Sequence, residues 1–425
     1  MSTFVDPTSS LVEYCQTMAG TFPDLAEPYY DKMVSYCQSK LWHQLTLLVL
    51  DFFAAKNTLR VVDEKQFEMN SNTFLGVYNH IVLKVSAKLN PLALARMAAE
   101  VAYLSLDPQV LAGGVVTEAA MANSKTLLQD LLPKTEQPAT LYLQSKLALL
   151  QMKDATTAKP AAELPTIYST IKSNATLLHQ LMMPDTPEAI MVHSAHYQMS
   201  MTYFKLMGPP EAFYEQAIRY LNYYQPDLTS PVAQQEQHQL AVDLCLAALV
   251  GEGVYNLGQV VTNPILKCLA NTPEHWLVDL LSACSMGSVA EFKACVNTKY
   301  PTQIASQPAL VNMGTQMQEK MTLLALVQMV FERPSSERTL PFVEIAARLD
   351  IPVEQVEWVI MRAFSVKLME GSMDQVDGIV HVTWILPRVL DATQLSDLAT
   401  RFGEWGTNVS ATKDYMQQQN PALTA

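Results

Sequence analysis

The sequence predicts a mainly α-helical protein: a right-handed helical-repeat solenoid, then a winged-helix domain, then a C-terminal helix. Three observations lead to this fold class. Only 14 of the 425 residues are glycine, whereas Leu, Ala, Gln and the 22 methionines are abundant, and this composition favours helix over sheet. Apolar residues recur at helical spacing in successive segments that prolines separate. Between residues 321 and 390 the apolar period then changes from helical to alternating.

The first part of the chain is expected to consist of antiparallel helix pairs. Residues 25–55 predict two helices, the second with an apolar face that includes Leu41, Leu45 and Phe52. Further helices are predicted at 74–104, 109–132, 139–152, 166–183, 187–207, 211–224, 233–250, 274–284 and 288–296. Pairs of roughly 35–45 residues resemble a solenoid of tetratricopeptide type, in which each pair buries its apolar face on its neighbours. Residues 154–163 have the composition of a mobile internal loop.

The segment 321–390 predicts a winged helix. A helix over 322–331 is expected to end before Pro334, and Thr339-Leu340 to form a short strand. Two helices follow, the first starting at Pro341 and the second after Ile351-Pro352. Apolar residues keep helical spacing in both, namely Phe342, Ile345, Ala346 and Leu349, then Val356, Val359, Ile360, Ala363 and Phe364.

Beyond Leu368 the pattern predicts a two-stranded wing. Strands are expected at 369–373 and 379–384, joined through Asp377-Gly378, a dipeptide suited to tight hairpin turns. In the second strand, Val380, Val382 and Trp384 are expected on one face. The order helix, strand, helix, helix and wing is that of a winged helix.

The residues of this segment closely resemble the winged helix of PCI domains. The resemblance rests on Glu344-Ile345, on the pair Val356-Glu357 and on the run Met369-Glu370-Gly371-Ser372-Met373-Asp374 that opens the wing. Together with the upstream helices, nearly the whole chain resembles PCI subunits of the 26S proteasome lid. The resemblance implies that winged helices pack side by side through the sheet edge, which places a contact at 371–384 with Val380 and Val382 in it. The alternative is a wing exposed to solvent.

The last segment predicts a helix that depends on partners. Asp391 and Gln394 resemble a capping box. Five apolar residues then recur at the alternating 3 and 4 spacing of a coiled-coil seam: Leu395, Leu398, Phe402, Trp405 and Val409. Gly403 and Gly406 weaken the isolated helix by about 1 kcal/mol each. The resemblance implies a helical bundle with other lid subunits, and the alternative is that this helix folds back on its own winged helix.

Charge argues against binding to nucleic acid or membranes. The formal net charge is −13 and the pI is near 5.1, whereas phosphate backbones and anionic lipids attract clustered Lys and Arg. The second helix of the winged helix carries two acidic and two basic residues between 353 and 368, and the wing adds three acids. No apolar run is long enough to span a bilayer, and the start of the chain lacks the pattern of a signal peptide. We therefore expect a protein of cytosol and nucleus.

The sequence predicts no catalytic residue, metal ligand or cofactor site. Six scattered cysteines without C-x-x-C spacing predict reduced core residues. His193 and His196 lie three apart but lack the further ligands of a metal site. The glycines at 251, 253 and 258 do not match a dinucleotide-binding fingerprint, and the chain has no P-loop, no G-x-S-x-G elbow and no H-x-H pair.

The predicted function is that of a non-catalytic scaffold subunit of the proteasome lid, bound to other PCI subunits in a hetero-oligomer. The segments would be an N-terminal solenoid at 1–165, the helical part of the PCI module at 166–320, the winged helix at 321–390 and the bundling helix at 391–425. Two alternatives remain open: a PCI subunit of another scaffold, the signalosome or a translation initiation factor, and a nucleic-acid adaptor of the messenger-export kind.

Overall fold

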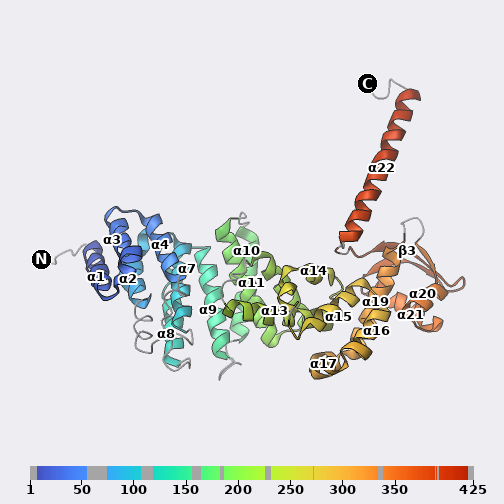
Figure 1. Ribbon diagram of the computed structural model, residues 1–425, viewed down its shortest axis with the longest axis horizontal. Coiled ribbons are helices and arrows are strands. Elements are labelled where there is room, and N and C mark those ends of the chain that lie inside the picture. Colours follow the sequence, from blue (N-terminus) through green and yellow to red (C-terminus); the bar gives the residue numbers. More distant parts are fainter. Residues whose placement is uncertain are drawn as a thin grey trace. The chain divides into compact units, whose positions relative to one another are not determined.

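The computed structural model describes residues 7–54, 74–106, 118–155, 164–181, 186–224, 231–270, 272–333, 338–387, 389 and 392–419. The chain forms two compact units, Met1–Gln225 and Pro226–Ala425. Both are mainly helical (Figure 1). The expected loop at 154–163 falls mostly outside the described residues, although its first two residues, Asp154 and Ala155, end a helix.

The first unit is a succession of helices, most of them paired with a neighbour along the chain. Its elements are α1 (Pro7–Thr21), α2 (Pro23–Leu25), η1 (Ala26–Tyr30), α3 (Asp31–Gln38), α4 (Trp42–Ala54), η3 (Tyr78–Val82), α6 (Leu83–Val85), η4 (Ser86–Lys88), α7 (Pro91–Leu104), α8 (Glu118–Gln129), η5 (Leu132–Lys134), α9 (Ala139–Ala155), α10 (Leu164–Leu181), α11 (Pro187–Met207) and α12 (Pro210–Tyr223). Helix α1 is not among the helices predicted from the sequence.

Prolines and caps explain where these helices begin. Asn90 precedes Pro91, and its side-chain oxygen accepts a hydrogen bond from the backbone N–H of Leu92 at 2.9 Å. Thr186 precedes Pro187 in the same way and accepts from the N–H of Ala189 at 3.3 Å. Proline suits the first helical turn because its missing N–H has no partner there. The start of α11 agrees with the predicted helix at 187–207, whereas the single helix predicted at 74–104 is wrong, because the chain is extended at Asn90 and α7 begins only at Pro91.

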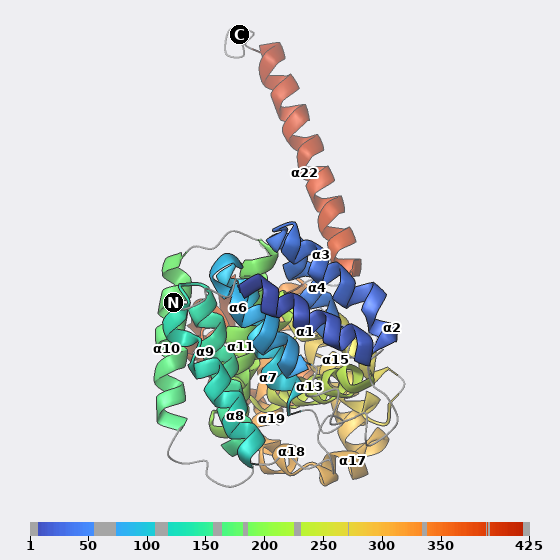
Figure 2. The same cartoon turned by 90° about the vertical axis from the view of Figure 1, so that its left-hand side faces the viewer.

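One extended hydrophobic core runs through most of this unit. It includes residues from Leu11 to Ala195, and a smaller cluster around Met152, Ile171 and Met199 joins α9, α10 and α11. Helix α9 packs against α8 and α10 (Figure 2), and α11 packs against α12. This stacking of neighbours is the arrangement expected for a helical-repeat solenoid.

The second unit begins with more helices and ends in a winged helix and a long helix. Its elements are α13 (Pro231–Val250), α14 (Gly258–Val261), η6 (Pro264–Leu269), α15 (His275–Met286), α16 (Val289–Ala294), η7 (Cys295–Lys299), α17 (Pro301–Ser306), α18 (Pro308–Asn312), α19 (Gly314–Phe331), β1 (Thr339–Pro341), α20 (Phe342–Leu349), α21 (Val353–Ser365), β2 (Met369–Asp374), β3 (Ile379–Ile385) and α22 (Ala392–Gln419). Helix α19 begins eight residues before the predicted start at Thr322. Asp391, the predicted cap of α22, lies outside the described residues.

The three strands form one antiparallel sheet in the order β1-β3-β2. In the register between β2 and β3, Gly371 pairs with Val382 but Glu370 pairs with Trp384, so Thr383 is an extra residue in β3. Such a bulge interrupts the alternation of faces. The expectation that Trp384 shares the face of Val380 and Val382 is therefore wrong, because Trp384 is 39% exposed whereas both valines are buried.

Candidate protein interaction surfaces

The residues that define the winged-helix signature hold the domain together. Ile345 and Val356 are fully buried. Glu344 on α20 forms an ion pair with Arg333, just beyond the end of α19. Glu357 on α21 accepts a hydrogen bond at 2.9 Å from the side chain of Gln375 in the wing turn. These contacts give each of the four residues a structural role in the winged helix.

The wing depends on Gly371 and Asp374. A side chain at Gly371 would collide with the backbone of β3, which passes directly beside it. The Asp374 carboxylate accepts hydrogen bonds from the backbone N–H groups of Val376 at 2.9 Å and Asp377 at 3.1 Å, and so closes the turn. Gly378 ends the turn at φ +65°, a conformation that favours glycine. The loop has four residues, 375–378, between the two strands.

The strand order changes which residues are available at the predicted wing contact. Val380 and Val382 are 0% and 2% exposed and lie on β3, the central strand. Their side chains pack into the domain, so they cannot touch a partner as expected. Within the described sheet, β2 forms the open edge on the wing side, where a partner strand could pair with backbone groups. The partner contact itself stays a prediction, in which the backbone of β2 would pair with a strand of the partner.

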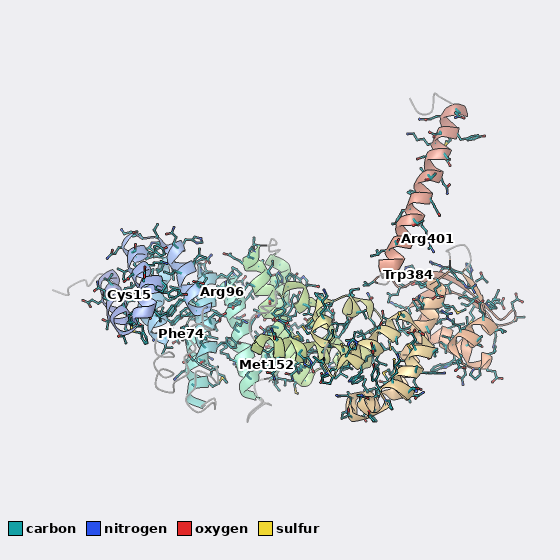
Figure 3. All side chains as sticks on the ribbon, viewed as in Figure 1. Cys15, Phe74, Arg96, Met152, Trp384 and Arg401 are labelled. Carbon is teal, nitrogen blue, oxygen red and sulfur yellow. The ribbon has the colours of Figure 1, made fainter. Side chains whose placement is uncertain are left out.

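The predicted seam of α22 is exposed along its length. The exposed fractions are 53% for Leu395, 38% for Leu398, 62% for Phe402, 66% for Trp405 and 47% for Val409. Met416 is 53% exposed and lies seven residues after Val409, so it continues the same face. Met416 is not among the predicted seam residues, although the heptad spacing alone points to it. Figure 3 shows the side chains of α22, with Arg401 labelled among them.

An exposed seam of this kind is unfavourable in water. Burying a large apolar side chain contributes about 1.5–3 kcal/mol, and scattered surface residues do not form such a periodic stripe. Both glycines of the helix, Gly403 and Gly406, have no atom within 4 Å of where a side chain would start. Space beside the helix is thus open, as a helical partner requires.

The second helix of the winged helix, α21, offers no basic surface for nucleic acid. Its Arg362 donates from Nε to Glu319 on α19 at 2.9 Å, and the acidic Glu354 and Glu357 share the helix. The helix also exposes two large apolar side chains, Trp358 at 62% and Met361 at 46%. A recognition helix contacts phosphates with unpaired basic residues, so these features disfavour a nucleic-acid interface.

The cysteines have the properties of core residues. None forms a disulfide, and all but Cys268 are buried. Burial raises the pKa of Cys15, Cys245 and Cys284 to about 12 and that of Cys37 to about 11. A thiolate is the nucleophilic form, so these four thiols are poor nucleophiles at neutral pH.

The described residues contain no group of three or more His, Cys, Asp and Glu placed to hold a metal ion. His193 stacks on Tyr223 with ring centroids 5.0 Å apart, and His196 is 4% exposed. Burial, with smaller effects of His193 and His179, lowers the pKa of His196 to about 4. His196 is therefore neutral at physiological pH. Of the helices that the structure describes, none has the length and apolar character needed to cross a membrane.

Comparison with known proteins finds two family models on this chain. One, described as PSD13 N-terminal repeats, matches residues 29–281, and the other, described as PCI domain, matches residues 297–384. The chain is 30% identical over 414 residues to 26S proteasome non-ATPase regulatory subunit 13 homolog B of Arabidopsis thaliana, which covers 97% of this chain and 99% of that protein. It is 28% identical to 26S proteasome non-ATPase regulatory subunit 13 of Dictyostelium discoideum, over 93% of each chain.

A weaker similarity extends to a different assembly. Eukaryotic translation initiation factor 3 subunit M of Aspergillus oryzae is 28% identical over 180 residues, which cover 42% of this chain and 38% of that protein. This similarity covers less than half of either chain, whereas the two proteasome relatives match 93% and 97% of this chain.

Proposed function

We propose, because the chain belongs to the family of 26S proteasome non-ATPase regulatory subunit 13, that it serves as a non-catalytic scaffold subunit of the regulatory-particle lid. In this role it supports assembly of the complex and thereby the ATP-dependent degradation of ubiquitylated proteins. No catalytic step takes place on this chain. The described residues fit this role, since the signature residues make structural contacts and four of the thiols are held in the protonated form.

The observation that carries the proposal is the exposed seam of α22. A helix that presents Phe402 and Trp405 at 62% and 66% exposure is not complete by itself. Partner helices that bury this seam would form a bundle, and β2 would add a second contact through its open edge. The partners are other PCI subunits of the lid, so the assembly is a hetero-oligomer. We place it in cytoplasm and nucleus, with neither nucleic acid nor membrane as a partner.

Each of four segments of the chain would have its own role in the assembly. The segments 1–165 and 166–320 supply helical-repeat surface, 321–390 supplies the winged helix, and 391–425 supplies the bundling helix. The two family models meet between residues 281 and 297, within the second of these segments. This division is a proposal about function, because compact packing alone separates the chain at residue 225.

The test is incorporation of a tagged full-length chain with the double substitution Phe402→Ala and Trp405→Ala. We expect recovery of other lid subunits to fall at least about tenfold in affinity purification followed by native mass spectrometry, since interface anchors of this kind each contribute about 2 kcal/mol or more. The matched control is Thr400→Ala with Thr407→Ala, which lie on the opposite face of α22 and bond only to their own helix. Full incorporation of the seam variant would refute the bundling role of α22.

The two alternatives predict different partners in the same experiment. Recovery with initiation-factor or signalosome subunits would place the chain in another PCI scaffold. The partial similarity to translation initiation factor 3 subunit M is the observation that supports this alternative. Retention on RNA or duplex DNA at about 150 mM salt would indicate the messenger-export kind of adaptor. The coverage of both chains by the proteasome relatives favours the lid.

A further inference from the structure

The heptad pattern of α22 places its other side chains relative to the exposed seam. The seam residues Leu395, Phe402 and Val409 take heptad position a. Leu398 and Trp405 take position d. Residues at positions e and g lie directly beside such a seam and face the partner helix, whereas positions b, c and f lie farther round the helix. The residues at e and g therefore indicate which flanking residues suit the partner.

The charged side chains of α22 are separated by sign between these two regions. Arg401 takes position g, next to Phe402 of the seam, and Lys413 takes position e. Glu404 takes position c and Asp414 takes position f. All four charged side chains are exposed, and Arg401 is labelled in Figure 3. Among the side chains that the structure describes on α22, both cations thus lie beside the seam and both acids lie away from it.

The other positions beside the seam carry no charge. Between residues 399 and 415 they hold Ala399 and Gly406 at e, and Asn408 and Tyr415 at g. No acidic residue at e or g in this range offsets the two cations. The flank of the seam is therefore positive, although the chain as a whole has a formal net charge of −13.

This charge pattern distinguishes between possible partner helices. Opposite charges at e and g across a helical interface favour a pair, and like charges suppress it. A second copy of this chain would present only neutral and basic residues at its own e and g positions between 399 and 415. It would therefore cover the apolar seam without offering a carboxylate to Arg401 or Lys413.

We propose that the partner of α22 is a helix of another protein chain that combines an apolar seam with acidic residues beside it, placed to face Arg401 and Lys413. This inference rests on the proposed function, since it assumes that a partner helix buries the seam. It adds the charge by which that helix is selected. Apolar burial supplies most of the affinity, whereas charged pairs at the rim of an interface mainly set the choice of partner and the rate of association.

The test is a competition between two full-length chains with different tags, wild type and variant, for incorporation into the same assembly. Peptide mass spectrometry measures their ratio after purification at about 50 mM salt. Arg401→Gln with Lys413→Gln should lower the share of the variant about threefold, because exposed ion pairs are individually weak. Arg401→Glu with Lys413→Glu should lower it about tenfold, because two attractions become two repulsions.

The matched control is Thr400→Glu with Thr407→Glu, which changes the net charge as much as the double glutamine variant does. Both threonines take position f and bond only to their own helix, so this variant should be incorporated like wild type. Raising the salt to about 500 mM should reduce the deficit of the double glutamate variant, because salt screens exposed charges. Equal incorporation of wild type and the double glutamate variant at low salt would overturn the proposal.

The seam variant Phe402→Ala with Trp405→Ala separates this failure from failure of the bundling role. If the seam variant is lost from the assembly and the double glutamate variant is not, α22 binds partners but charge does not select them. Sedimentation and hydrogen exchange of the free full-length chain test the other occupants. We expect a monomer with fast amide exchange in residues 395–416. A dimer, or slow exchange that the seam substitutions abolish, would show a second copy or the chain's own winged helix on the seam, and would overturn the proposal.

Discussion

The substitution Gly371→Ala tests whether the close approach of β2 and β3 holds the wing together. An added Cβ would lie nearest the carbonyl oxygen of His381, closer than real Cβ atoms come to any neighbour. It would also lie 3.0 Å from Cα of Val382 and 3.1 Å from the carbonyl carbon of His381. All three are backbone atoms of a central strand, which cannot rotate away as a side chain can, so the two strands must separate. Overpacking of this kind costs about 1–3 kcal/mol.

A loss of about 2 kcal/mol corresponds to roughly a 30-fold rise in local opening. Hydrogen exchange of the backbone amides in residues 368–386, followed by mass spectrometry, measures this opening directly. Gly403→Ala is the control, because no atom lies within 4 Å of its added Cβ, and it should stabilise α22 by up to about 1 kcal/mol. Exchange in the wing that stays within about threefold of wild type for Gly371→Ala would refute the reasoning.

Three further predictions concern single side chains. The Lys320 ammonium donates hydrogen bonds to the carbonyls of Ala248 at 2.6 Å and Gly251 at 3.0 Å, at the end of α13. Lys320→Met removes these donors, so hydrogen exchange of the backbone amides in the last turn of α13 should rise at least tenfold. Unchanged protection of these amides would contradict the capping role of Lys320. Asp374→Ala removes the two hydrogen bonds that its carboxylate accepts in the turn, and should destabilise the wing by about 1–2 kcal/mol. Hydrogen exchange in the β2–β3 hairpin that stays at the wild-type rate would disprove this. His196→Gln addresses pH: the folded-state pKa of His196 is lowered to about 4 from 6.5, so the unfolded chain binds more protons and wild type loses up to about 3 kcal/mol as pH falls from 6.5 to 4. Denaturant titrations between pH 6.5 and 4 measure this loss of stability, and the His196→Gln variant should lack it. If wild type and variant have identical stability profiles over this pH range, His196 is not the source of the loss.

The winged helix was readable from the sequence because its signals are local. Prolines and caps mark helix starts, the apolar period tells helix from strand, and Asp377-Gly378 marks the turn. The strands, the two helices and the seam of α22 therefore lie where the sequence predicts them, within a few residues. The α19 start was missed because Gly314 and the polar residues after it carry no cap signal.

The partner contact at the wing was only partly predictable. Alternation correctly put Val380 and Val382 on one face, but whether that face meets the domain or a partner depends on which strand is central. That order requires β1 to pair with β3 across about 40 residues of chain, and sequence spacing says nothing of such pairing. The bulge at Thr383, which exposes Trp384, likewise appears only in the register.

The sequence by itself determined the helical fold class, the winged helix with its turn, the apolar seam of α22 and the absence of familiar catalytic motifs. These features follow from residue type and spacing within a few turns of chain, where local sterics and apolar periodicity act. Only the tertiary structure decided the strand order, the burial of Val380 and Val382, and the burial of the polar side chains of Asn174, His196 and Ser200. Such groups become neighbours through packing between separate helices, and a polar group lacks a partner only in relation to everything that surrounds it.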